Sequence, residues 1–278
     1  MDSKYTQRTS QDDMRWKVYS GPPSADWHAL WPNLAPHRAR LLDLHCPRSD
    51  VALLDASLLN AGRGIGPERF GMCDAGYRDA GGADVAPTVD RANQRSRELQ
   101  LGIEFDVASA DNLPYADASC DVLTMFDNLF GLVTPRSARL AVLAEARRVL
   151  KPGGLLFLEA ASLYSSYRGL LWIRLSELIR GFYNPCRLEP GDKLRHSARR
   201  VPVAPAELPR SHWFRPREID DDAREMAFDV VHATTVKGIL RDPSADSHTY
   251  HGEGRLLYVL QRPAGDASGH CRVSESQP

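Results

Sequence analysis

The stretch Leu58-Leu-Asn-Ala-Gly-Arg-Gly-Ile-Gly66 decides how the rest of this chain is interpreted. An apolar run that begins at Val51 ends here in three glycines at alternate positions, Gly62, Gly64 and Gly66. Glycine tolerates positive φ and leaves room for a ligand because it has no Cβ. A helix that follows such a loop directs its unpaired N–H groups into it. The stretch predicts a strand, a nucleotide-binding loop and a helix, although a simple tight turn fits the glycines alone equally well.

Charge and cysteine usage narrow the class of protein. The 278 residues carry 35 Lys and Arg against 36 Asp and Glu, a formal net charge of -1. A nucleic-acid partner usually requires a basic excess, so none is expected. No apolar run has the length of a membrane span, and the polar residues Met1–Trp16 are unlike a secretory signal. The five cysteines are scattered and lack zinc spacing, which predicts a cytoplasmic protein with reduced thiols and no metal.

Strands and helices alternate from Val51 to Ala160, which is typical of a parallel sheet with helices on both faces. Strands are expected at the end of 51–61 nearest Gly62, in 81–84 and in three further segments: 103–107, 120–126 and 155–160. One helix is expected over 88–101. A second is expected to begin at Thr134, which would cap it with a proline just inside, and to end at 151–154. Further on, a helix is expected over 216–226. The strands 228–236 and 254–261 should pair antiparallel because no helix is expected between them.

The two ends of the chain and one internal segment differ from this pattern. An N-terminal helical segment includes a helix at Pro36–His45 with Leu41, Leu42 and Leu44 on its apolar side. Residues 162–212 are first aromatic and leucine-rich, then basic and proline-rich, and are interpreted as an insertion that covers the ligand end of the sheet. The expected organisation is a helical segment (1–50), a cofactor-binding core (51–161), the insertion (162–212), the rest of the core sheet (213–263) and a disordered tail (264–278).

Four stretches, in order, resemble class I S-adenosylmethionine-dependent methyltransferases of the type 11 kind. They are Leu58 to Gly66, Ala83-Asp-Val-Ala-Pro87, Ser109-Ala-Asp-Asn-Leu-Pro-Tyr-Ala-Asp-Ala-Ser-Cys-Asp-Val122 and Glu145-Ala-Arg-Arg-Val-Leu-Lys-Pro-Gly-Gly154. The resemblance implies an α/β fold with a Rossmann-like seven-stranded sheet. That sheet is mostly parallel, its last strand is antiparallel, helices flank it, and the insertion precedes strand six.

The resemblance also implies where S-adenosyl-L-methionine binds. Asp84 would accept both ribose hydroxyls, and the glycine loop would hold the ribose and methionine portion through its backbone. Adenine would lie against Val85 and the loop that begins at Ser109, while Asp127 would face the methionine end or the acceptor. The full set of expected cofactor residues is Asn60, Gly62, Gly64, Gly66, Asp84, Val85, Ser109, Ala110, Asp111 and Asp127.

Several positions bear on this assignment. Asn60 stands where the family usually has an acidic residue, and Ser109 replaces an aspartate that Asp111 would then substitute. A nicotinamide cofactor favours Gly-x-Gly-x-x-Gly, but the third glycine of that pattern would fall on Pro67, which disfavours a dehydrogenase.

We expect methyl transfer to an O, N or C atom of a small-molecule acceptor such as a secondary metabolite. An oxygen acceptor often needs a base, for which His212 is the first candidate and His28 the second; His37 and His232 are further candidates, and packing or surface roles compete for each. The alternative function is a protein of the same fold that binds the cofactor or its product without methylating, as a cyclase or a non-catalytic partner. The acceptor is expected to be the main partner, and a homodimer is left open.

Overall fold

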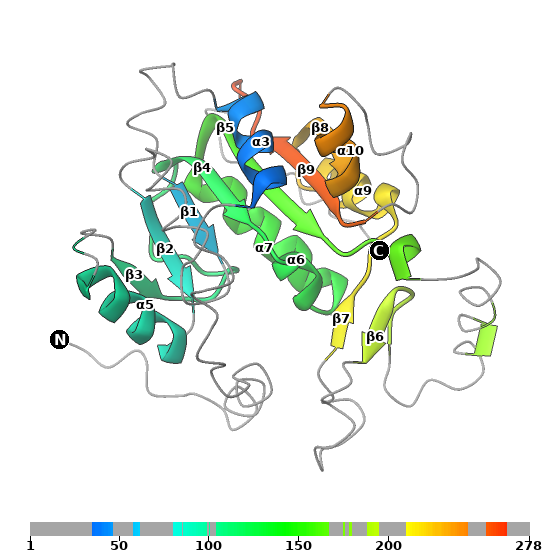
Figure 1. Ribbon diagram of the computed structural model, residues 1–278, viewed down its shortest axis with the longest axis horizontal. Helices are drawn as coiled ribbons and strands as arrows, with labels where there is room; N and C mark the ends of the chain where they lie inside the picture. Colours follow the sequence, from blue (N-terminus) through cyan, green and yellow to red (C-terminus); the bar gives the residue numbers. More distant parts are fainter. Residues whose placement is uncertain are drawn as a thin grey trace, which may run out of the picture.

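A computed structural model describes residues 35–46, 58–61, 80–84, 86–98, 100, 104–166, 175, 178–179, 188–194, 210–243 and 254–265. Its main feature is a seven-stranded sheet in the order β3-β2-β1-β4-β5-β9-β8 (Figure 1). The strands are β1 (Leu58–Ala61), β2 (Ala80–Asp84), β3 (Phe105–Val107), β4 (Cys120–Met125), β5 (Leu150–Ala160), β8 (Asp229–Thr235) and β9 (Leu256–Gln261). β9 runs antiparallel to both of its neighbours, whereas every pair among β1 to β5 is parallel. The expected mostly parallel sheet with an antiparallel last strand is confirmed.

The sheet is apolar on both faces because the inner strands alternate between two layers. On β5, Leu156 and Leu158 belong to one buried cluster, while Phe157 between them belongs to the other. The antiparallel partner β9 divides in the same way, with Tyr258 in the first cluster and Val259 in the second. Successive side chains of a strand point to opposite faces, so a strand covered on both sides needs a continuous apolar run.

Helices cover both layers. They are α3 (Pro36–His45), α5 (Ala86–Glu98), α6 (Leu129–Leu132), α7 (Arg136–Val149), α9 (Pro216–Glu225) and α10 (Val236–Arg241). Helices α7 and α9 pack on the first cluster, where Val142, Leu143 and Ala146 form the buried stripe of α7. Helices α3 and α10 pack on the second cluster through Leu41, Leu42 and Ile239. Within the described residues, no helix is long and apolar enough to cross a membrane.

Three expectations about helix ends and faces were wrong. A helix, α10, does lie between β8 and β9. It has six residues, and its N-cap is Thr235, whose hydroxyl accepts a hydrogen bond from the Gly238 N–H at 3.0 Å. The antiparallel pairing expected there is nevertheless present. No side chain caps α7 in the way expected for Thr134; Pro135 is the N-cap, and a carboxylate from the insertion accepts the first N–H of the helix. Leu44 is 45% exposed, so it is not part of the apolar side of α3.

Some element bounds also moved. α5 begins at Ala86, β3 at Phe105 and β9 at Leu256, each close to its expected start. β5 includes Lys151 to Gly154, which were expected only to end the preceding helix, because Gly153 adopts φ 83° and the chain continues directly into the strand. The insertion contains a short ribbon, β6 (Asp192–Leu194) paired antiparallel with β7 (Arg210–His212), that the sequence pattern did not indicate. Figure 1 shows this ribbon beyond the carboxyl ends of β4 and β5.

Candidate functional site

The carboxyl ends of the parallel strands form one edge, and this is where ligands bind in open α/β sheets. The register pairs Ala61 of β1 with Ala83 of β2, so Asp84 comes one residue beyond the partner of the last residue of β1. Neighbouring strands lie about 4.8 Å apart, so the backbone of Asp84 lies close to the point where the chain leaves β1 toward Gly62. Asn60 lies one residue earlier on β1. The glycines of the loop, with Val85 and His28, lie outside the described residues.

The loop after β3 reaches the same edge. Asp84 pairs with Val107, and the chain then turns through Ser109, whose carbonyl accepts the Asn112 N–H at 3.0 Å. Ser109 and Asp111 are exposed and Ala110 is half-buried. The structure therefore brings the expected ribose residue and the expected adenine loop together at neighbouring strand ends.

Beyond β4 the backbone takes two consecutive left-handed conformations, with φ 57° at Asp127 and φ 61° at Asn128. Such conformations cost free energy in non-glycine residues and often occur at functional sites. Here they are held on both sides: the Asn128 N–H donates to the Glu159 carbonyl at 3.1 Å, and the Asn128 amide oxygen accepts the Ala161 N–H at 2.6 Å. This fixes the direction in which Asp127 leaves the end of β4.

A buried carboxylate network lies over the ends of β4, β5 and β9. Glu159, only 1% exposed, accepts a hydrogen bond from Arg38 Nε of α3 at 2.7 Å and one from Arg255 Nη1 at 2.5 Å. Both arginines also contact Asp127 Oδ1, at 2.7 Å from Arg38 Nη2 and 3.2 Å from Arg255 Nη1. Among the described residues this network joins two arginines to two carboxylates, so their charges compensate one another.

The charges in this network fix the ionisation of Glu159. Burial opposes ionisation, yet the pKa of Glu159 falls to about 2 because His37, Arg38 and Arg255 surround the carboxylate. We assign the larger part of the lowering to the two guanidinium groups, since His37 Nε2 lies 3.6 Å from the carboxylate and has no hydrogen-bond partner among the described residues. Glu159 is therefore ionised at neutral pH and orients both arginines.

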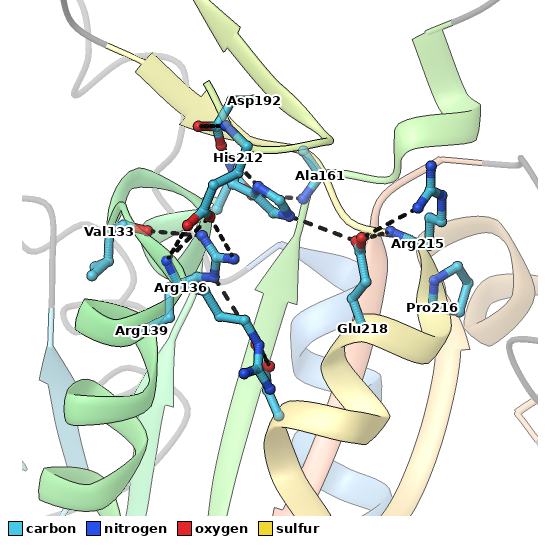
Figure 2. Close-up of polar contacts among 12 residues, drawn as sticks. Val133, Arg136, Arg139, Ala161, Asp192, His212, Arg215, Pro216 and Glu218 are labelled. Carbon is cyan, nitrogen blue, oxygen red and sulfur yellow. Dashed lines mark hydrogen bonds and ion pairs between the residues drawn. The ribbon is translucent and has the colours of Figure 1, made fainter. Parts of the chain in front are cut away.

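A second polar cluster joins the β6–β7 ribbon to the core (Figure 2). His212 Nδ1 lies 2.9 Å from Asp192 Oδ1, and Nε2 points toward Glu218 of α9 at 3.6 Å without forming a hydrogen bond. His212 is 2% exposed and its ring contacts Phe214 edge-on. Burial lowers the pKa of His212, but Asp192 and Glu218 outweigh it and the pKa is raised.

Glu189 attaches the ribbon to the start of α7. Its two carboxylate oxygens each lie 3.1 Å from the Arg136 N–H, and Oε2 lies 3.4 Å from Arg139 Nη2. An anion at a helix N-terminus is favourable because the first N–H groups have no partner within the helix. Glu189, Asp192 and His212 together offer three metal-type ligand atoms within 4.8 Å. Their hydrogen bonds and the neighbouring Arg139 explain the group as an anchor, and we assign no metal to it.

The sequence did not single out several of these residues: Arg38, Glu159, Asp192, Glu189 and Arg255. One signal was present, because Glu159 is an acidic residue in an otherwise apolar strand run, and a buried charge needs a partner. Asp127 was expected to face the cofactor or the acceptor, and the structure adds that Arg38 and Arg255 hold it.

A seven-stranded sheet with this order and this ligand edge defines the α/β class to which cofactor-binding methyltransferases belong. Residues 59–158 match the family described as "Methyltransferase domain". Over these residues the chain is therefore similar to methyltransferase domains, a family that uses S-adenosylmethionine.

Two curated relatives are similar in sequence, and a solved structure is similar in fold. Methyltransferase GfsG of Streptomyces halstedii is 28% identical over 188 residues, covering 66% of this chain and 61% of the relative. The 27-O-demethylrifamycin SV methyltransferase of Amycolatopsis mediterranei is 34% identical over 116 residues, 41% of each chain. This chain thus matches less than two thirds of the length of either relative. The 1,6-didemethyltoxoflavin-N1-methyltransferase of Burkholderia thailandensis has a similar fold, with TM-score 0.56 and 14% identity over 95% of this chain and 93% of that one.

Proposed function

We propose that this protein is an S-adenosylmethionine-dependent methyltransferase that methylates an oxygen, or alternatively a nitrogen or carbon, of a small-molecule acceptor. The observation that carries the proposal is the β1–β2 register, which brings the carboxyl end of the glycine-loop strand beside Asp84. The match of residues 59–158 to a methyltransferase domain supports the same reading. An acceptor from secondary metabolism is favoured because one relative is named for rifamycin methylation.

The chain's own residues would bind and orient the reactants. The cofactor supplies an electrophilic methyl group, and the protein must align the acceptor and exclude water. In this proposal Asp84 accepts the ribose hydroxyls, and the backbone from Gly62 to Gly66 holds the cofactor from the side of β1. The loop from Ser109 to Asp111, next to Asp84, contacts adenine, and Asp127 marks the boundary between cofactor and acceptor.

His212 is our proposed base for an oxygen acceptor, and His28 remains the second candidate. Its orientation supports this role: Asp192 engages Nδ1 at 2.9 Å, which leaves Nε2 as the nitrogen able to take a proton. Because the His212 ring is only 2% exposed, the acceptor would have to enter the fold to contact Nε2. Replacing His212 with glutamine should remove the ionisation of a base from the pH profile of turnover; a profile that keeps its shape would reject the base role and leave an anchoring role.

Calorimetric titration with S-adenosylhomocysteine tests the cofactor site. Asp84→Asn should weaken binding by about tenfold to a hundredfold, because the ribose hydroxyls lose a charged acceptor. Asp90→Asn is the matched control, since Asp90 is an exposed carboxylate on the adjacent helix α5. Equal affinity of both variants and the unchanged protein would remove Asp84 from the site.

A second measurement tests methyl transfer itself. The chain is incubated with S-adenosylmethionine and a panel of hydroxylated and amino-substituted small molecules, and S-adenosylhomocysteine formation is followed by mass spectrometry. Product that depends on both reactants supports the proposal. Tight cofactor binding with no product from any acceptor in the panel would favour the non-methylating alternative.

A further inference from the structure

Two arginines, Arg38 and Arg255, meet at the carboxyl ends of β4 and β5 and the amino end of β9. They differ in how much of each side chain is exposed. The Arg38 side chain is only 3% exposed and its Nε and Nη2 both engage carboxylates, so it is committed to the interior. The Arg255 side chain is 48% exposed, although it contacts the same two carboxylates. Arg255 thus presents an exposed guanidinium group that two carboxylates hold in place.

Arg255 is anchored through one nitrogen. Nη1 donates to Glu159 Oε1 at 2.5 Å and to Asp127 Oδ1 at 3.2 Å, and these are its side-chain hydrogen bonds within the described residues. Nε and Nη2 form the side of the guanidinium that binds a carboxylate through two parallel hydrogen bonds. The anchoring thus uses one edge of the group and leaves the two-pronged edge available.

The position of Arg255 puts that edge beside the proposed reaction site. Arg255 immediately precedes β9, whose first residue Leu256 pairs with the last residue of β5, Ala160. Its contact with Asp127 carries the guanidinium across the end of β5 to the end of β4. Apart from Asp127 itself, the cofactor residues proposed above lie on the other side of β4, at the ends of β1, β2 and β3.

The preorganisation of this group also favours ligand binding. Glu159 is buried and its pKa is lowered to about 2, so it is ionised at neutral pH and holds Arg255 through the hydrogen bond that Nη1 donates. Holding the side chain in advance removes much of the entropy cost that a free arginine pays when it binds a ligand. Two carboxylates balance Arg38 and Arg255, so selectivity would come from the geometry of the hydrogen bonds more than from net charge.

We propose that Arg255 is the acceptor-specificity residue of this protein and that it binds a carboxylate of the acceptor through Nε and Nη2. This inference rests on the proposed methyl-transfer function and narrows its substrate class to carboxylic acids. Neutral esters of the same acids have no anionic oxygen to accept the two parallel hydrogen bonds and should bind less well.

The test uses paired probes on the full chain saturated with S-adenosylhomocysteine. Binding of 4-hydroxybenzoate and octanoate is compared by calorimetry with binding of their methyl esters. Each acid should bind about tenfold tighter than its ester, and Arg255→Gln should bring the ratio close to one. Arg255→Lys, which keeps the charge toward Glu159 but has no two-pronged edge, should lose most of the preference. Arg224→Gln, at an arginine of α9 that is 67% exposed, should leave the ratio unchanged.

Equal binding of acid and ester would overturn the proposal, as would an acid preference that survives in Arg255→Gln. The absence of binding of either acid up to about 10 mM would also overturn it. The carboxylate could instead be that of the cofactor, so affinity for S-adenosylhomocysteine is measured in each variant. A loss there reassigns Arg255 to the cofactor and also overturns the proposal. If the unchanged protein does not bind S-adenosylhomocysteine, the methyltransferase function fails separately, and the same acid and ester titrations on the free protein still decide the role of Arg255.

Discussion

Replacing Glu159 with glutamine is the most direct test of the buried network, because the substitution removes charge while keeping size. The pKa of Glu159 falls from 4.5 to about 2 in the folded protein. At about 1.4 kcal/mol for each pH unit, the ionised side chain contributes about 3 kcal/mol to stability at pH 7. An independent estimate agrees, since removal of one partner from a buried ion pair costs about 3–5 kcal/mol.

The sign of the pH dependence follows from the lowered pKa. The stabilisation by Glu159 is fully present above pH 4.5 and is lost as the pH falls toward 2, where the folded protein also takes up the proton. The free energies of unfolding of the two proteins should therefore differ by about 3 kcal/mol at pH 7 and converge below pH 4. For a domain of this size, the difference at pH 7 corresponds to a loss of about 6–12 °C in Tm.

Urea denaturation followed by circular dichroism, repeated from pH 3 to pH 8, measures the free energy of unfolding of each protein and its dependence on pH. Asp221→Asn serves as the control because Asp221 also pairs with an arginine, Arg224, but both side chains are more than 60% exposed. Such surface pairs contribute about 0.2–1 kcal/mol, so this control should change little. A loss below about 1 kcal/mol for Glu159→Gln at pH 7, or a loss that stays constant down to pH 3, would refute the electrostatic account.

Three further substitutions test the attachment of the β6–β7 ribbon, all by urea unfolding. The pKa of His212 is raised, so the stabilisation it contributes is complete below pH 6.5 and is lost as the pH rises through the pKa of the folded protein. Asp192→Asn should reduce this dependence of the free energy of unfolding on pH, and an unaltered pH dependence would contradict the pairing. Glu189→Gln should cost about 1 kcal/mol through the N-terminus of α7, and stability unchanged at low salt would count against that contact. Gly131→Ala should cost about 1–3 kcal/mol because a Cβ would lie 2.5 Å from the His212 carbonyl oxygen; a neutral result would mean that the ribbon is not packed there.

The central sheet was predictable because its signals are local and repeated. The apolar run at Leu155 to Leu158 predicts a buried strand, and the helical spacing of apolar residues in 136–149 predicts a helix. Both elements, β5 and α7, are present. The Gly62 motif and Asp84 are separated by a weak, glycine-rich strand, yet the parallel order of β1 and β2 brings their neighbours together as expected. In such elements the burial pattern and the chain order determine the structure.

The missed features depend on contacts between distant parts of the chain. β6 and β7 have three residues each and are joined by a basic, proline-rich segment, so neither strand shows alternation. α10 has six residues and includes Gly238, so its propensity is poor and its cap and burial must stabilise it. The pairing of Arg38 with Glu159 spans 121 positions, and no spacing rule reaches across that distance.

The two polar clusters explain how α3 and the β6–β7 ribbon are held at the ligand edge. Apolar contacts are non-directional, whereas hydrogen-bonded ions in a low dielectric specify one arrangement and penalise others. Arg38 fixes α3 against β5 and Asp127. Glu189 fixes the ribbon against α7, and Asp192 joins β6 to β7 through His212. The proposed cofactor contacts depend instead on β1, β2 and β3. If the proposals above hold, substitutions in either polar cluster, other than at Asp127, should alter acceptor binding while cofactor affinity stays within about threefold, because the two sets of contacts arise from different strands.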